Sequence, residues 1–292
     1  MKLRYVTIHV RNTMIITDRF VMIHFPKTGT TFCRRAMKQL YKSIVSFKHA
    51  TTRFEWFLFK TGLKRKPQIQ FLALPDIRTK KKFGELTEHG TVSQIPAVYS
   101  DLPIVSVTRN PFERCVSMYE YRAWQRPPWL NFSYKKYFPN YPDLSFTEYM
   151  QLYFHYGSGP YASLPRAVKR FDVGGHTIHF IMFYAYRPYE VLEALDDDYI
   201  EQEGFSRDLA PVEFLHTENL NQELHDFFLR YGFRTEQVRF ILDMEKKNVS
   251  RPKGRDWRNY FTQDLFDLVR YKERMLFKIF PQYLQPFDDY IL

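Results

Sequence analysis

Short, mainly apolar runs mark the candidate strands in the first part of the chain. The pattern predicts two short strands at residues 5–10 and 14–17, joined by a turn, and then an apolar run at residues 20–25. A similar run occupies residues 103–108. Compact, mainly apolar runs of this length are typical of strands that are buried on both faces of a sheet. We therefore expect a buried parallel strand at residues 20–25 and a second buried strand at residues 103–108.

A predicted helix follows each of these two buried strands. The first covers residues 31–41, and the second runs from residue 110 to about residue 124. The second has a typical helix start, with Asn110 at the cap, Pro111 at the first helical position and Glu113 at the third. A strand, a loop and a helix in this order form the anion-binding unit of many α/β proteins.

The rest of the chain carries weaker patterns. They predict strands at residues 176–184 and 212–216, and helices at residues 190–195, 221–231 and 261–280. Residues 47–98 predict no particular element. The chain has no internal repeat and no low-complexity linker, and its 292 residues fit one large domain. We therefore expect a single domain over residues 1–292.

The charge balance favours anionic partners. The chain has 43 Lys and Arg against 32 Asp and Glu, which gives a formal net charge of +11. Nucleotide phosphates, acidic sugars, nucleic acid and membrane surfaces all fit such a charge, so charge alone does not choose among them.

Cysteine usage and the N-terminus bear on the compartment. Cys33 and Cys115 both fall in the predicted helices, which argues against a disulfide framework and for a reducing compartment. Charges interrupt the apolar residues of the N-terminal segment. We therefore expect a cytoplasmic protein without a signal peptide or a transmembrane segment.

The loop between the first buried strand and its helix has the composition of a phosphate cradle. Gly29 would let the backbone approach a ligand, the hydroxyls of Thr30 and Thr31 would donate to anionic oxygens, and Lys27 would add a full charge. The candidate binding residues are Pro26, Lys27, Thr28, Gly29, Thr30, Thr31 and Phe32. The lysine precedes a lone glycine, which argues against the Walker loop of ordinary ATPases. The alternative is a simple strand-to-helix turn with Thr31 as the cap.

A second candidate site lies at the end of the strand predicted at residues 103–108. Arg109 ends this strand, and Ser117 follows about two helical turns into the next helix, so a guanidinium and a hydroxyl could converge on one phosphate. The alternative is that Arg109 pairs with a neighbouring acid and that Ser117 bonds to its own helix.

These two segments, in this order, resemble the donor-binding motifs of sulfotransferases that use 3′-phosphoadenosine 5′-phosphosulfate (PAPS) and release 3′-phosphoadenosine 5′-phosphate (PAP). Residues 25–32 are similar to the 5′-phosphosulfate loop of that family, and residues 105–117 are similar to its 3′-phosphate motif. The resemblance implies an α/β class, P-loop-like three-layer fold, in which helices flank a central parallel β-sheet. It also implies that PAPS is the donor and that no metal is required.

The same resemblance implies a role for each matching residue. Residues Lys27, Gly29, Thr30 and Thr31 would bind the 5′-phosphosulfate, and Lys27 would also stabilise the leaving phosphate. Arg109 and Ser117 would hold the 3′-phosphate.

The segment at residues 250–262 resembles the C-terminal donor-binding loop of cytosolic sulfotransferases. The resemblance adds Arg251, Lys253 and Gly254 as candidate 3′-phosphate contacts. Pro252 separates the two cations here, unlike in that family. Without the resemblance, the segment would equally fit a solvated basic turn.

Sulfuryl transfer also needs a base that removes the acceptor proton, and His89 is the first candidate. It lies twenty residues before Arg109, about where sulfotransferases carry a catalytic histidine, and its surroundings resemble those of the uronyl 2-O-sulfotransferases. Glu88 is the second candidate, and a structural turn is the alternative. The acidic run Asp196-Asp197-Asp198 is expected to be a solvated loop rather than a metal site.

An aromatic and proline-rich insertion at about residues 124–165 is the candidate lid over the acceptor. Aromatic faces suit sugar rings and planar small molecules. Four nearby cations could hold an anionic acceptor, namely Arg122, Arg126, Lys135 and Lys136. Ordinary packing of a large insertion is the alternative.

The sequence therefore predicts a sulfotransferase that acts on a hydroxyl of a carbohydrate or a small metabolite and does not bind nucleic acid. The rival functions are an ATP-dependent kinase and a non-catalytic basic protein that binds a nucleotide or a polyanion.

Overall fold

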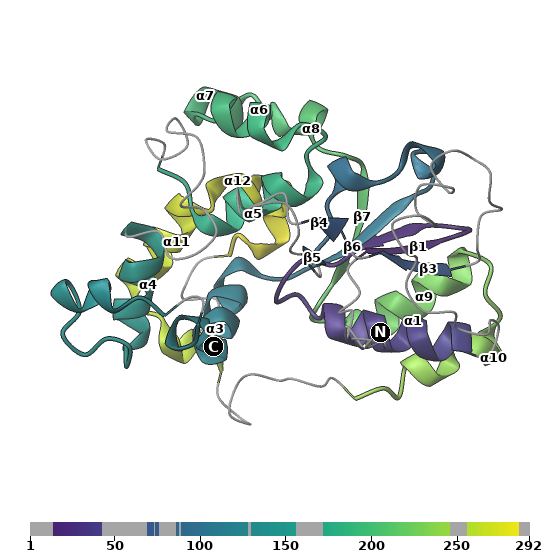
Figure 1. The fold of residues 1–292 in the computed structure, drawn as a ribbon, viewed down its shortest axis with the longest axis horizontal. Coiled ribbons are helices and arrows are strands. Elements are labelled where there is room, and N and C mark those ends of the chain that lie inside the picture. Colours follow the sequence, from purple (N-terminus) through teal and green to yellow (C-terminus); the bar gives the residue numbers. More distant parts are fainter. Residues whose placement is uncertain are drawn as a thin grey trace, which may run out of the picture.

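The computed structural model describes residues 14–42, 69–72, 74–75, 86–87, 89–127, 130–155, 172–245 and 256–285. Within these ranges a five-stranded sheet lies between two groups of helices (Figure 1). This arrangement confirms the α/β class and the three-layer arrangement expected from the sequence.

The sheet contains both parallel and antiparallel strands. Its strand order is β3 (Ile69–Leu72), β1 (Met14–Thr17), β2 (Val21–Ile23), β6 (Ile104–Thr108) and β7 (Val212–His216). Strands β2, β6 and β7 are parallel, whereas β1 runs antiparallel to both β2 and β3. The expectation of a parallel sheet is therefore correct for three strands, and β1 and β3 add an antiparallel edge.

Four of the predicted strands can be compared with the structure. The strands expected at 14–17, 20–25, 103–108 and 212–216 appear as β1, β2, β6 and β7. The strand expected at residues 5–10 lies outside the described residues. A separate two-stranded sheet pairs β4 (Leu74–Pro75) with β5 (Leu86–Thr87).

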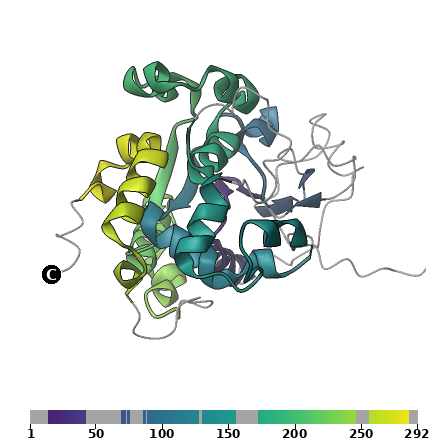
Figure 2. The same cartoon turned by 90° about the vertical axis from the view of Figure 1, so that its left-hand side faces the viewer.

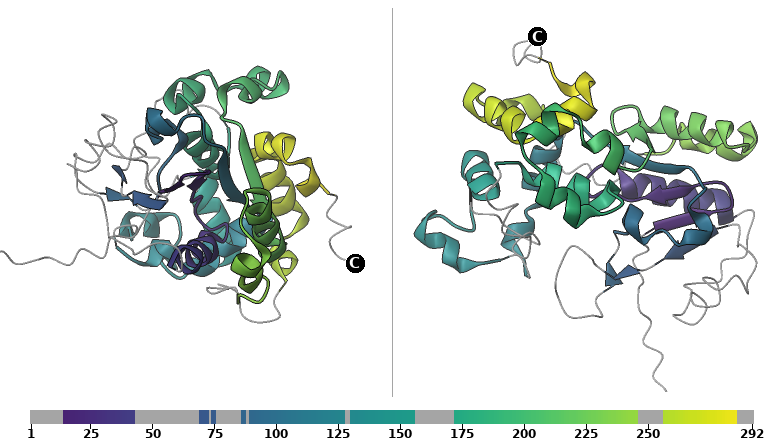
Figure 3. Two further views of the ribbon diagram at one scale, coloured as in Figure 1. Left: turned by 90° about the vertical axis from the view of Figure 1, so that its right-hand side faces the viewer. Right: turned by 90° about the horizontal axis from the view of Figure 1, so that it is seen from above.

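One face of the sheet packs against α1 (Thr30–Lys42) and α9 (Leu220–Arg230). The two helices lie side by side beneath the strands, in purple and green in Figures 1 and 3. Alternate strand residues such as Ile15, Met22 and Val105 point to this face, as the two-residue period of a strand requires. The two short helices that follow α9 are α10 (Thr235–Val238) and η6 (Arg239–Ile241).

The opposite face carries a larger core built from five helices. They are α3 (Pro111–Tyr121), α4 (Phe146–His155), α5 (Gly175–Tyr184), α11 (Gln263–Lys272) and α12 (Arg274–Ile279). Phe112 lies at the centre, with its ring stacked 4.2 Å from that of Phe266 and 5.6 Å from that of Trp257. Such stacked aromatic contacts fix α3, and with it the strand end that precedes it.

Helices α6 (Pro188–Ala194), α7 (Asp197–Glu201) and α8 (Phe205–Asp208) lie together at the top of Figures 1 and 2. They share a third apolar cluster with α5. Asp196 caps α7 by accepting a hydrogen bond from the amide of Tyr199 at 2.7 Å. The acidic run thus starts a helix, where negative charge is favourable. The short 3-10 helices are η1 (Val92–Gln94), η2 (Ala97–Tyr99), η3 (Ala123–Gln125), η4 (Phe132–Lys136), η7 (Trp257–Tyr260) and η8 (Pro281–Tyr283).

The strand predicted at residues 176–184 is wrong, because this segment forms helix α5. Nearly every side chain of α5 is buried, so no polar stripe reveals the helical period. A run that is apolar on all sides fits a buried helix as well as a buried strand. The fully buried carboxylate of Glu273 decides the outcome, because it accepts hydrogen bonds from the amides of His176 and Thr177 at the first turn of the helix.

The other predicted helices are confirmed. The helix expected at 190–195 corresponds to α6, that at 221–231 to α9, and that at 261–280 to α11 and α12, which meet at Glu273. Cys33 and Cys115 are both free and belong to the cores on opposite faces of the sheet. Among the described residues, no helix has the length and apolar character needed to cross a bilayer.

Candidate functional site

The loop between β2 and α1 adopts an unusual backbone conformation. Lys27 has φ 68° and Gly29 has φ 90°, both in the left-handed region. A side chain at Gly29 would place its Cβ 2.8 Å from Cδ2 of Leu220, so both the dihedral angle and the space require glycine. The expected strand, loop and helix are therefore present, and Thr31 lies within the first turn of α1 rather than at its cap.

The loop side chains divide into inward and outward groups. Thr28 is fully buried, and its hydroxyl donates to the carbonyl oxygen of Phe25 at 2.9 Å. Phe32 is packed in the core with α9. Thr31 is exposed, whereas Pro26 and Lys27 are partly buried. Thr28 and Phe32 thus support the shape of the loop, Thr30 is largely buried, and Pro26, Lys27 and Thr31 reach the surface.

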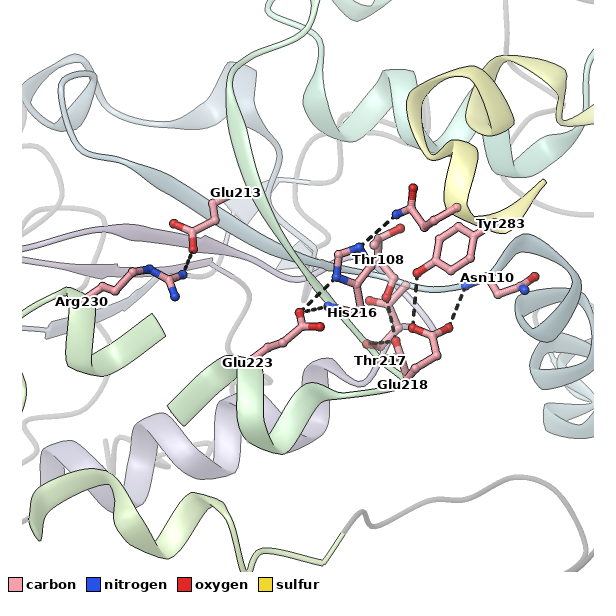
Figure 4. Close-up of polar contacts among 11 residues, drawn as sticks. Thr108, Asn110, Glu213, His216, Thr217, Glu218, Glu223, Arg230 and Tyr283 are labelled. Atoms are coloured by element: carbon pink, nitrogen blue, oxygen red, sulfur yellow. Dashed lines mark hydrogen bonds and ion pairs between the residues drawn. The ribbon is translucent and has the colours of Figure 1, made fainter. Parts of the chain in front are cut away.

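Thr217, directly after β7, connects the loop between β2 and α1 to the end of β6. Its hydroxyl lies 2.9 Å from the carbonyl oxygen of Thr28 and 2.8 Å from that of Thr108 (Figure 4). Beside it, the carboxylate of Glu218 accepts hydrogen bonds from the amide of Asn110 and from the hydroxyl of Tyr283. The turn after β7 therefore connects the loop after β2, the end of β6 and the start of α3.

Arg109 joins the strand end to the loop. Its Nη1 donates to the carbonyl oxygen of Lys27 at 3.3 Å, and its Nε donates to Glu113 at 3.0 Å. The neighbouring acid that the alternative interpretation invoked is thus a real partner. A guanidinium presents its N–H groups in a planar fork that matches the geometry of carboxylate and phosphate oxygens. Ser117 is buried within α3.

Three cations lie close together at the loop between β2 and α1, namely Lys27, Arg109 and Arg114. Burial and the nearby charges of Arg109 and Arg114 lower the pKa of Lys27 to about 8. The Lys27 ammonium lies 4.0 Å from the ring centre of Tyr121, a cation–π contact. Repulsion among like charges of this kind is relieved when an anion binds between them, so the loop is suited to a multiply charged ligand.

His89 lies next to the segment that leads into the loop. Its Nδ1 donates to the carbonyl oxygen of His24 at 3.1 Å, because a carbonyl can only accept. Its ring packs at 6.1 Å from that of Phe183 on α5. In the neutral form this bond places the lone pair on Nε2, which is the tautomer that a general base needs.

Four of the candidate residues lie outside the described residues. They are Glu88, Arg251, Lys253 and Gly254. Among the described residues, no group of three His, Cys, Asp or Glu side chains could hold a metal ion.

The sequence did not single out Arg114, yet this residue touches the loop. It is buried within α3, and its Nε donates to the carbonyl oxygen of Pro26 at 3.2 Å. In the sequence it follows Glu113 and looks like half of a solvated charge pair. The available signal was the apolar character of nearby positions, with Phe112 two residues before it and Cys115 directly after it.

Comparisons with known proteins give a limited result. No family model matches the chain, and no curated protein matches it. Among solved structures it is similar to the mouse sulfotransferase SULT7A1, solved in complex with PAP, at 14% identity and a TM-score of 0.43. The similarity covers 88% of this chain and 84% of the mouse chain. These values do not establish a common activity, so the interpretation of the site depends on its own residues.

Proposed function

We propose that this protein is a sulfotransferase that transfers the sulfuryl group of PAPS to an acceptor hydroxyl. The contact between Arg109 and the carbonyl oxygen of Lys27 carries the proposal, because it brings the two motifs together at the ends of neighbouring parallel strands. In open α/β sheets, ligands bind at the carboxyl ends of the strands.

The 5′-phosphosulfate would lie on the loop. The amides at the start of α1 and the hydroxyls of Thr30 and Thr31 supply donors, and Lys27 supplies the charge that offsets the negative charge on the departing phosphate. Arg109 and Ser117 would hold the 3′-phosphate. The additional 3′-phosphate contacts that we propose are Arg251, Lys253 and Gly254.

The transfer is an in-line displacement at sulfur. The acceptor oxygen forms the new S–O bond while the bond between sulfur and the phosphate oxygen breaks, and the products are PAP and the sulfate ester. His89 would take the acceptor proton on Nε2, with Glu88 as the alternative base. The hydrogen bond from His89 to the carbonyl oxygen of His24 orients the ring for this role.

The acceptor would be a hydroxyl of a carbohydrate or a small metabolite, bound against the insertion. Part of the insertion has a structural role, since Trp124 and Tyr141 are packed in the core. Phe132 and Tyr137 are exposed and carry Lys135 and Lys136 over their rings, at 5.6 and 4.4 Å. An exposed surface of rings and cations suits an anionic acceptor that presents a flat face. We further propose that the chain is a single cytoplasmic domain.

Calorimetry tests the donor. We expect PAP to bind the protein in the absence of magnesium, and to bind far more tightly than Mg-ATP. Preference for Mg-ATP would support a kinase instead. Binding of PAP without transfer from labelled PAPS to any acceptor in a broad carbohydrate and metabolite panel would support a non-catalytic nucleotide-binding protein.

A further inference from the structure

Arg114 is a buried cation under the phosphate loop. Only 2% of the Arg114 surface is exposed to solvent. Its Nε donates to the carbonyl oxygen of Pro26 at 3.2 Å, its Nη2 lies 3.3 Å from Nδ1 of His179 on α5, and its guanidinium carbon lies 4.2 Å from the ring centre of Phe25. Burying a guanidinium is costly unless its charge and its donors are compensated.

The nearby compensating charge is Glu273, which is also fully buried. Its carboxylate accepts from the amide and hydroxyl of Thr177 at 2.7 Å each, two residues before the His179 that Arg114 contacts. Burial lowers the pKa of Arg114 and raises the pKa of Glu273, and their opposite charges counteract both shifts. Helix α5 thus connects two buried opposite charges, and one of them reaches the loop.

Two arginines hold the two peptide groups on either side of Lys27. Arg114 donates to the carbonyl oxygen of Pro26, and Arg109 donates to the carbonyl oxygen of Lys27 itself. The orientation of these two carbonyls determines the φ and ψ angles of Lys27. A left-handed conformation costs a residue with a side chain about 1–2 kcal/mol, so it persists only where surrounding contacts fix it.

We propose that Arg114 is a positioning residue for the donor site, which holds Lys27 in its left-handed conformation and adds positive charge beneath the loop. This inference rests on the proposed function for the identity of the donor. An apolar side chain could fill the same space, but it could not donate to Pro26. The buried guanidinium therefore supports the loop in addition to packing in the core.

The binding experiment compares Arg114→Met and Arg114→Lys with a matched control, Val116→Ala, on the same helix. Val116 is fully buried in the same core, and its apolar side chain cannot donate a hydrogen bond to the loop. We expect Arg114→Met to weaken PAP binding by about 10- to 100-fold, the loss expected for a charged hydrogen bond. Val116→Ala should lower the melting temperature and leave PAP affinity unchanged. Equal PAP affinity in Arg114→Met and the wild type would overturn the inference, as would an equal loss in Val116→Ala.

A second readout needs no donor. The pH dependence of Lys27 acylation, followed by peptide mass spectrometry, should show half-maximal reactivity near pH 8 in the wild type. Arg109 and Arg114 are the charges that lower the Lys27 pKa, and the ring of Tyr121 lies against its ammonium. Arg114→Met should move the midpoint upward because one positive charge is lost, whereas Arg114→Lys should keep it near the wild-type value while still weakening PAP binding.

The two readouts separate the inference from the proposed function. If the wild type does not bind PAP, the donor assignment fails, and the acylation midpoint still tests the position and charge of Arg114. An unchanged midpoint in Arg114→Met would contradict the role of Arg114 even if PAP binds. If Arg114→Met does not fold, Arg114→Lys decides the matter through PAP affinity, and unchanged affinity would overturn the inference.

Discussion

His89 donates from Nδ1 to the carbonyl oxygen of His24, three residues before Lys27 on the chain. The bond fixes both the tautomer of His89 and its distance from the loop. We expect His89→Gln to lower turnover by about 10²- to 10⁴-fold, the usual contribution of a general base, while PAP affinity stays the same. Steady-state kinetics and calorimetry measure the two quantities separately.

The control for this prediction is His225→Gln. His225 lies on α9 and pairs with its neighbour Asp226 at 2.8 Å. The His225→Gln substitution should therefore leave turnover unchanged. Wild-type turnover in His89→Gln would remove His89 as the base and leave Glu88 as the next candidate.

The lowered pKa of Lys27 predicts a pH dependence of donor binding. Lys27 is cationic below about pH 8 and neutral above it, so PAP affinity should fall as the pH rises through this value. The phosphates of PAP are already largely ionised in this range and do not contribute the change. A bound anion raises the Lys27 pKa, so the affinity should decline from about pH 8 up to the higher pKa that Lys27 has in the complex.

Lys27→Met should abolish transfer and also remove this pH dependence. Calorimetric titrations between pH 6.5 and 9.5 compare the two proteins. The prediction fails if the affinity of Lys27→Met for PAP still declines with the wild-type midpoint.

The position of Arg109 predicts that its substitution will affect PAP binding more than turnover. Arg109→Ala removes the candidate 3′-phosphate contact, so we expect PAP affinity to fall by about 10- to 100-fold. Turnover at saturating donor should change much less, because the 3′-phosphate is remote from the reacting sulfur. In Glu113→Gln the guanidinium stays and a competing negative charge disappears, so PAP affinity should not fall. A larger loss in Glu113→Gln than in Arg109→Ala would show that the ion pair, and not the guanidinium, matters.

The left-handed conformation of Gly29 predicts a loss of binding in Gly29→Ala. The added Cβ would contact Leu220, and the backbone would be strained by about 1–2 kcal/mol. We expect lower stability together with weaker PAP binding. Gly232→Ala is the matched control, since Gly232 has φ 79° and its Cβ would meet only the flexible Arg19 side chain, at 3.2 Å. It should lose similar stability in urea unfolding and keep PAP affinity; a loss of affinity there would point to general destabilisation.

The sequence predicted the parts of the fold that local patterns determine. The loop from Pro26 to Gly29 could be found because a lone glycine and a lysine interrupt a strand and a helix, and Asn110 could be found as a cap because cap chemistry is local. The antiparallel placement of β1 and β3 could not, because it depends on which strands meet in the sheet. The sequence of α5 predicted a strand because its side chains are buried on all sides and no polar stripe shows the helical period.

The same limit applies to the site. Arg109 and Lys27 were predicted as separate motifs, and their contact depends on the parallel pairing of β2 with β6. Arg114 was missed because its burial is set by α5, which lies far along the chain. Residues whose role depends on a distant element carry little trace of that role in their own neighbourhood of the sequence.

The hydroxyl of Thr217 lies within hydrogen-bonding distance of the carbonyl oxygens of both Thr28 and Thr108. The loop and the strand end are therefore held together by the protein's own contacts, and little ordering entropy remains to be lost when a nucleotide binds. Association should then be a single fast step, with a rate that depends on salt through long-range attraction to the basic surface and not on a slow rearrangement.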